Sequence, residues 1–177
     1  MKRSLILFAS FALMALVGTA GMAANKPVID GVVKDGEYSY SQDFGQLQLY
    51  LNRTADTLSI AVVGNTKGWV AAGLSESLKM DGATIFMGFV TDDGTVQLKP
   101  QAGSGHSHAD TEKAVSDTIV SSAMKEAAGK TTLEIALKPA GYIKDGQKTL
   151  NMIYAMGAQD SFSPRHTLRG AVSVNLQ

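Results

Sequence analysis

The stretch QLQLYLN, residues 46–52, carries a leucine at every second position. Leu47, Leu49 and Leu51 point to one face of an extended chain, and the residues between them point to the other face. A helix would spread the same three leucines around its axis, because its side chains repeat about every 3.6 residues. The pattern therefore predicts a β-strand with one buried face.

Similar stretches follow along most of the chain. Several alternate in the same way, and the others are rich in β-branched or aromatic residues. The expected strands are residues 46–52, 58–63, 69–74, 83–90, 96–99, 131–138, 150–156 and 171–176. Turn-forming pairs separate them, and Asp93-Gly94 predicts a β-hairpin. About eight or nine short strands at this spacing predict an all-β fold, namely an antiparallel β-sandwich.

Two segments differ from this pattern. Residues 121–128 are the only stretch with helical character, and it is short. Residues 100–116 are rich in Gly, Ser, His and Asp, so we expect a long irregular loop there. Long loops in compact domains are often functional or mobile.

The start of the chain has the three parts of a secretory signal peptide. Lys2 and Arg3 are followed by an uncharged, mostly apolar run over residues 4–17, and then by small residues up to Ala24. The apolar run is shorter than the roughly 20 residues that a membrane-spanning helix needs. We therefore expect a cleavable signal peptide rather than an uncleaved amino-terminal anchor.

Cleavage after Ala23 or Ala24 would put a small side chain at the cut. It would leave one domain, residues 25–177, which is long enough to bury a core. No later stretch is long and apolar enough to span a bilayer. The sequence thus predicts residues 1–24 as a signal peptide and a periplasmic or secreted domain without an integral membrane span.

The charge balance and the absence of cysteine narrow the function classes. The whole chain has 16 basic and 16 acidic residues, and loss of Lys2 and Arg3 with the signal peptide makes the net charge −2. This balance does not favour a nucleic acid or an anionic membrane as a partner. Because the chain has no cysteine, disulfides, thiolate metal sites and covalently attached c-type haem are excluded.

Residues that could carry chemistry are few. No glycine pattern of a nucleophile elbow marks a serine, and the scattered Asp and Glu residues show no recognisable glycosidase pair. We therefore expect a protein that is not an enzyme. The chain has three histidines, which are His106, His108 and His166.

Two loops carry the most distinctive residues. Met80 lies between two expected strands, and His166 lies just before the last one. Met80 could simply plug the end of the sandwich, and His166 could be an ordinary exposed histidine. If both loops lie at one end of the sandwich, the thioether and the imidazole would face each other across a pocket. Two such ligands on opposite sides of one iron make a six-coordinate haem that suits electron transfer.

Such a haem needs flat apolar walls and positive charges for its propionates. The candidate wall residues, each equally suited to a plain core, are Trp69, Phe86, Met87, Phe89 and Tyr154. The candidate propionate partners, each equally suited to a solvated surface, are Lys79, Arg165 and Arg169.

At these residues the sequence resembles the DOMON superfamily, whose members include the cytochrome domain of cellobiose dehydrogenase. The likeness covers most of residues 28–176. It is sharpest in GWVAAGL at 68–74 with MDGA at 80–83, and in YAMG at 154–157 with HTLRG at 166–170. The resemblance implies an immunoglobulin-like β-sandwich.

In the haem-binding branch of that superfamily, the resemblance implies one b-type haem, haem b. Its axial ligands would be Met80 and His166, so these two are the expected metal ligands. The expected cofactor-binding residues are Met80, His166, Trp69, Phe86, Tyr154 and Arg169. The implied function is electron transfer to or from a redox partner protein or a membrane oxidoreductase, since the chain carries one candidate redox site.

Other interpretations stay open. The second branch of the superfamily binds sugars or other ligands without haem, and IDG at 29–31 with GEY at 36–38 also resembles exported carbohydrate-binding sandwiches. The chain could instead be a structural or accessory subunit of an exported complex. His106 and His108 lie outside the family pattern, and they could bind copper or zinc weakly or belong to a mobile polar loop.

Overall fold

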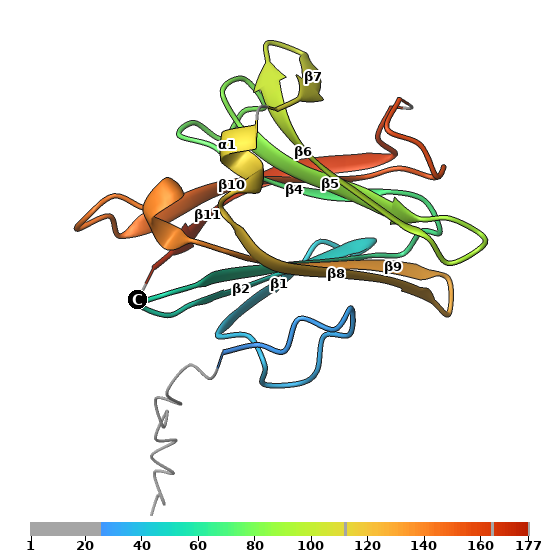
Figure 1. Ribbon diagram of the computed structural model, residues 1–177, viewed down its shortest axis with the longest axis horizontal. Coiled ribbons are helices and arrows are strands. Elements are labelled where there is room, and N and C mark those ends of the chain that lie inside the picture. The colour runs from blue at the N-terminus through green and yellow to red at the C-terminus, as the bar shows by residue number, and fades with distance from the viewer. Residues whose placement is uncertain (1–25, 112, 164, 177) are drawn as a thin grey trace, which may run out of the picture.

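A computed structural model describes residues 26–111, 113–163 and 165–176. The predicted signal peptide, residues 1–24, lies outside the described residues. The described chain is an all-β sandwich of two facing antiparallel sheets (Figure 1). This confirms the immunoglobulin-like β-sandwich that the sequence predicted.

The first sheet has five strands in the order β1-β2-β3-β9-β8. Every neighbouring pair in it is antiparallel. The strands are β1 (Tyr40–Asp43), β2 (Leu47–Arg53), β3 (Leu58–Gly64), β9 (Lys130–Leu137) and β8 (Ile119–Ala127).

The second sheet has six strands in the order β11-β10-β4-β5-β6-β7, again all antiparallel. These strands are β11 (Leu168–Asn175), β10 (Thr149–Met156), β4 (Val70–Leu74), β5 (Thr84–Val90), β6 (Val96–Ser104) and β7 (Ser107–Asp110). Two short helices, α1 (Lys113–Ser116) and the 3-10 turn η1 (Pro139–Gly141), complete the described elements.

The main core lies between the sheets, where alternate residues of each strand meet. Leu47, Leu49 and Leu51 of β2 are all buried in it, as their spacing predicted. Burial of a leucine side chain contributes about 1.5–3 kcal/mol, so this core supplies most of the driving force in a fold without disulfides. The predicted hairpin at Asp93-Gly94 is also confirmed, because it joins β5 to β6.

Two sequence predictions about local structure are wrong. Residues 119–127 form strand β8 rather than a helix, because their backbone pairs with β9 along the edge of the first sheet. Residues 100–116 are not one irregular loop, since β6 runs to Ser104 and turns directly into β7. Gly105 adopts a φ of 57° in that tight turn, a conformation that glycine reaches without strain. In both segments, long-range pairing outweighed local preference.

Each sheet also has an outer face, and part of each outer face is covered by another segment of the chain. The amino-terminal segment, residues 28–38, runs below the five-stranded sheet in Figure 1, and the loop of residues 157–167 rises beside the six-stranded sheet. Within the described residues, no helix is long and apolar enough to cross a membrane.

Candidate functional site

The outer face of the six-stranded sheet carries a second apolar cluster, separate from the main core. Its buried members are Trp69, Ala71, Ala83, Ile85, Met87 and Phe89, and its partly buried members are Met80, Ile153, Ala155 and Phe162. The outer face of an antiparallel sheet is commonly solvated and polar. An apolar outer face is therefore a candidate binding surface, and we call this set the outer cluster.

The strand registers show how the outer cluster is laid out. Arg169, Ala155, Ala71, Met87 and Lys99 are successive cross-strand partners from β11 to β6, so they form one row on the outer face. Two alanines lie near the middle of the row and a basic residue lies at each end. The centre of the row therefore carries small apolar side chains, and a positively charged side chain lies at each end.

The loop of residues 75–83 approaches the outer cluster from the end of β4. Its Met80 is partly buried and packs on the cluster. The Met80 carbonyl oxygen accepts a hydrogen bond from the Ala83 amide at 2.9 Å. The Gly105 amide donates to Asp81 Oδ1 at 2.7 Å, which ties this loop to the β6–β7 hairpin.

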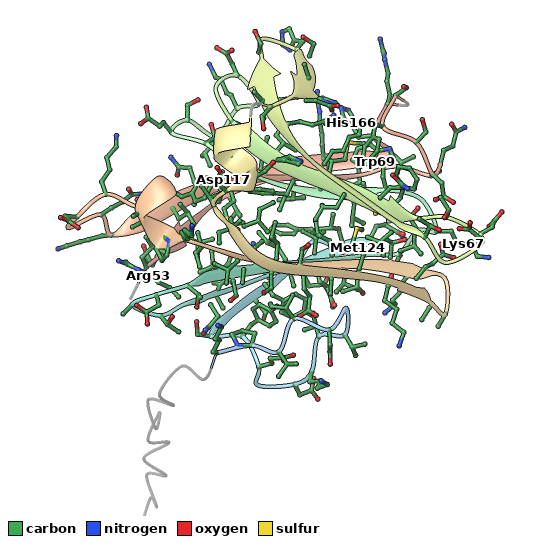
Figure 2. All side chains as sticks on the ribbon, viewed as in Figure 1. Arg53, Lys67, Trp69, Asp117, Met124 and His166 are labelled. Atoms are coloured by element: carbon green, nitrogen blue, oxygen red, sulfur yellow. The ribbon has the colours of Figure 1, made fainter. Side chains whose placement is uncertain are left out.

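The loop of residues 157–167 approaches from the end of β10 and folds over the same face. Phe162 packs against Phe89 with ring centroids 4.8 Å apart, and Lys99 Nζ lies 5.1 Å from the Phe162 ring centroid. His166, in the return of this loop toward β11, is exposed. Figure 2 shows His166 and Trp69 on the outer side of the six-stranded sheet.

The same loop lies near the turn between β5 and β6. Burial raises the pKa of the Asp160 carboxyl, and the negative charge of Asp92 in that turn raises it further. Trp69 joins the loop to β4, since its amide donates to the Gln159 carbonyl at 3.3 Å and its carbonyl accepts from the Gly157 amide at 2.9 Å. The loop is thus held by backbone bonds at its start, by Phe162 at its middle, and at its end by the Thr167 amide, which donates to the Met156 carbonyl at 2.8 Å.

The two loops do not lie at one end of the sandwich, as the sequence analysis required for a shared pocket. In the β10–β4 register, Met156 pairs with Val70 and Met152 pairs with Leu74. The loop after Met156 and the loop after Leu74 therefore leave the sheet at opposite ends, because antiparallel neighbours run in opposite directions. What Met80 and Phe162 share is the outer face, over which both loops fold back.

The structure separates the predicted site residues into two groups. Trp69 and Met80 belong to the outer cluster, and Arg169 lies at its rim. Phe86 and Tyr154 belong to the main core on the other side of the sheet. Phe86 meets Tyr142 edge to face at 6.2 Å, and Tyr154 stacks on Phe44 at 4.1 Å. These two rings cannot line a site together with Met80, because the sheet lies between them.

The outer face also holds two buried polar atoms that lack a partner among the described residues. They are Trp69 Nε1 and Gln101 Oε1, and each residue is only 4% exposed. A buried donor or acceptor left unpaired costs about 1–3 kcal/mol. Such atoms call for an explanation, and a bound group is one.

Sequence reasoning missed several residues of this face. Ile85, Lys99, Gln101, Ile153 and Phe162 were not singled out, although Met87 and Phe89 were named as candidate walls. A signal was available, because TIFMGFV at 84–90 is apolar at both odd and even positions. A strand that is apolar on both faces is covered on both faces.

Two further features lie apart from the outer cluster. His106 and His108 are exposed in the β6–β7 hairpin, and the described residues contain no group of three or more His, Cys, Asp or Glu that could hold a metal ion. A polar hollow of about 240 Å³ lies beside the β1–β2 turn. Its lining includes Asp43, Gln46, Gln48, Asn65 and Lys130.

Comparison with known proteins supports the fold. No family model and no curated protein matches the chain. The cytochrome domain of Myriococcum thermophilum cellobiose dehydrogenase is similar in structure, with a TM-score of 0.53 and 13% identity over 78% of this chain and 81% of that chain. A family 9 carbohydrate-binding module from Caldicellulosiruptor kristjanssonii, in complex with cellotriose, has a TM-score of 0.50 and 13% identity over 83% of this chain and 80% of that chain. At these identities the likeness shows a shared β-sandwich, and the fold suits either a cytochrome domain or a sugar-binding module.

Proposed function

We propose that this chain is an exported b-type cytochrome domain that binds one haem and exchanges electrons with a redox partner protein or a membrane oxidoreductase. One observation carries the proposal. The outer cluster is apolar, and the two loops that fold over it carry a thioether, Met80, and an imidazole, His166. These are the two side chains that hold haem iron in electron-transfer cytochromes.

The residues of the outer face fit a haem in their chemistry. The apolar row has small side chains at its centre, Ala71 and Ala155, and Arg169 at one end offers positive charge for a propionate, whereas Lys99 at the other end is paired with Asp110. The unpaired Trp69 Nε1 packs against Gly157 at the start of the 157–167 loop. When bound, the haem supplies a centre that changes its charge by one electron at a time.

The chain's own residues have distinct tasks in this proposal. The Met80 backbone is held near the face by the Ala83 amide and the Asp81–Gly105 bond, and its side chain packs on the outer cluster. His166 is exposed, and its loop is held by Phe162 and, next to His166, by the bonds from Thr167 to the Met156 carbonyl. Haem binding in this proposal requires that loop to rearrange, because His166 and Met80 lie in loops that leave the sheet at opposite ends. Phe86 and Tyr154 have no part in the site, because they support the sheet from inside.

The visible spectrum tests the proposal directly. The full chain, expressed with haem available, should show a strong Soret band and sharp α and β bands after reduction. Replacing Met80→Leu or His166→Ala removes one axial ligand, so each variant should change the spin state or lose the haem. Colourless protein after haem supply would contradict the proposal.

Matched controls keep the ligand assignment separate from general damage. Met124→Leu changes a methionine that packs in the main core, and His106→Ala changes an exposed histidine of the β6–β7 hairpin. Both variants should keep the parent spectrum. A parent-like spectrum in His166→Ala would show that the imidazole ligand is wrong even if haem binds.

A haem-free sugar-binding module is the second candidate, and the polar hollow beside the β1–β2 turn favours it. The amides of Gln46, Gln48 and Asn65 and the charges of Asp43 and Lys130 could bind hydroxyl groups there. The single tryptophan argues against it, because Trp69 is buried and offers no exposed ring for a sugar. Calorimetric titration with cello-oligosaccharides tests this candidate, and heat of binding that Asn65→Ala abolishes would support it.

A further inference from the structure

The β6–β7 hairpin presents a set of side chains on the outer face, beside the outer cluster. Gly103 pairs directly with His108, and Gln101 pairs directly with Asp110. Directly opposed residues of antiparallel strands project to the same side, about 4.5–5.5 Å apart at Cβ. Gln101 in turn pairs with Ile85 of the outer cluster, so all four residues belong to the outer face.

Met80 lies on this side of the hairpin. A Cβ atom on Gly103 would overlap the Met80 carbonyl oxygen and would lie 3.1 Å from Met80 Cγ. Position 103 therefore needs glycine, because Met80 fills the place of its side chain. Since His108 projects from the same side as that missing Cβ, the imidazole rises from the face on which the Met80 segment lies.

Backbone bonds hold Met80 in this register. The Gly82 amide donates to the Gly103 carbonyl at 3.0 Å, and the Gly103 amide donates to the Ala83 carbonyl at 2.8 Å. The Asp81 carboxylate fixes the turn of the hairpin through the Gly105 amide. The position of Met80 on this face of the hairpin is therefore built by both segments together.

Gln101 adds an acceptor whose orientation is determined by its neighbour. Gln101 Nε2 donates to Asp110 Oδ1 at 3.1 Å, and Lys99 Nζ donates to Asp110 Oδ2 at 2.9 Å. An ionised carboxylate only accepts, so the amide nitrogen of Gln101 must face it and the amide oxygen must face away. That oxygen is buried and has no donor among the described residues.

The imidazole of His108 is also available for a ligand. It is exposed, and no hydrogen bond or ion pair is formed by it within the described part of the chain. The Met80 segment, the His108 imidazole and the unpaired Gln101 oxygen thus belong to the same face of the hairpin. Thioether sulfur is a soft ligand that selects Cu(I), and imidazole suits copper in either oxidation state.

We propose that Met80 and His108, with Gln101 as the third group, form a site for one Cu(I) ion on the β6–β7 hairpin. The site goes beyond the proposed haem function and shares only Met80 with it. His106, at the turn, is not a ligand in this proposal, so only His108 of the two histidines binds the copper. One sulfur cannot serve both metals, so haem-free protein would be the copper-binding form.

Competition for Cu(I) tests the site in the full chain prepared without haem. Bicinchoninate serves as the coloured competitor, and ascorbate keeps the copper reduced. The parent protein should withdraw one equivalent of Cu(I). His108→Ala and Met80→Leu each remove a ligand, and each should weaken the affinity at least about tenfold, since even outer partners of metal sites contribute that much. His106→Ala should leave the affinity unchanged.

Two variants distinguish this proposal from the haem proposal. His166→Ala should lose the haem spectrum and keep Cu(I) affinity, and His108→Ala should lose Cu(I) affinity and keep the haem spectrum. No withdrawal of copper from the competitor would overturn the site. An equal loss in His106→Ala and His108→Ala would overturn it too, because the two imidazoles alone would then hold the metal without Met80.

Discussion

The two outer faces of the sandwich are covered in different ways. On the five-stranded sheet, the amino-terminal segment 28–38 is bound by hydrogen bonds to one buried carboxylate, that of Glu134. On the six-stranded sheet, the loops 75–83 and 157–167 lie on apolar side chains. The first cover is bound to one buried carboxylate, and the second combines apolar contact with backbone hydrogen bonds at the ends of its loops.

Glu134 is central to the first cover. It is 0% exposed and projects from β9 away from the main core. Its Oε2 accepts from the amides of Asp30 at 3.1 Å, Gly31 at 2.7 Å and Val32 at 3.1 Å. Its Oε1 accepts from the Tyr38 hydroxyl at 2.6 Å. A buried charge is tolerated only when it is paired in this manner.

The two covers differ in what opening them would cost. We interpret the Glu134 contacts as structural and the outer cluster as the candidate binding surface. Opening the first cover would leave a buried carboxylate and several amides unpaired, which is costly. Opening the second cover would expose apolar surface, and a flat apolar ligand would bury that surface again. The proposed function therefore assigns the ligand to the outer cluster rather than to the face that Glu134 covers.

The largest expected effect comes from removing the carboxylate of the first cover. Glu134→Ala leaves the amides of Asp30, Gly31 and Val32 without their acceptor, so the free energy of unfolding should fall by about 3 kcal/mol or more. Urea denaturation measures this loss. Glu76→Gln is the matched control, because Glu76 and its partner Lys144 are fully exposed, and its midpoint should not move. An unchanged midpoint in Glu134→Ala would show that the segment is not held by this carboxylate.

A smaller effect is expected at the phenol that donates to Glu134. Tyr38→Phe removes one hydrogen bond to a charged acceptor, which should cost about 1.5–3 kcal/mol at neutral pH. Burial raises the pKa of the Tyr38 hydroxyl, and the bond to Glu134 raises it further. Because this pKa is higher in the folded state, the contribution is complete below about pH 10 and is lost as the pH rises, when the unfolded chain ionises.

Urea midpoints measured from pH 8 to 11 follow this pH dependence. The parent should lose stability across the upper part of that range, and Tyr38→Phe should lose less. Tyr40→Phe is the control, because burial raises its pKa but it has no carboxylate partner. If the urea midpoint falls equally with pH in the parent and in Tyr38→Phe, the stabilising bond from Tyr38 to Glu134 is contradicted.

The smallest effect on stability should come from the second cover. Phe162→Ala removes the Phe89–Phe162 pair, and such aromatic pairs contribute about 0.5–1.5 kcal/mol. Its main effect should be on access, because Trp69 is the only tryptophan and lies in the outer cluster. Acrylamide quenching of tryptophan fluorescence should rise in this variant. Leu78→Ala, an exposed residue in the other loop, should leave quenching unchanged, and equal quenching in parent and Phe162→Ala would mean that the loop is not held by this ring.

The sequence by itself determined the fold class. The alternation in residues 46–52, 150–156 and 172–176 predicted strands that the structure contains, because side-chain period is a local property of an extended chain. It also marked Met80 and His166 as unusual residues in loops. It predicted neither β8 nor β7, since both depend on pairing with a partner strand.

Only the tertiary structure decided which face each residue serves. Phe86 and Met87 are neighbours in the sequence, yet one supports the main core and the other the outer cluster. The packing of Met80 on Gly103, the partner of His108 in the β6–β7 hairpin, likewise follows from long-range pairing. Composition and spacing cannot contain this information, because it arises when backbone pairing brings distant segments together.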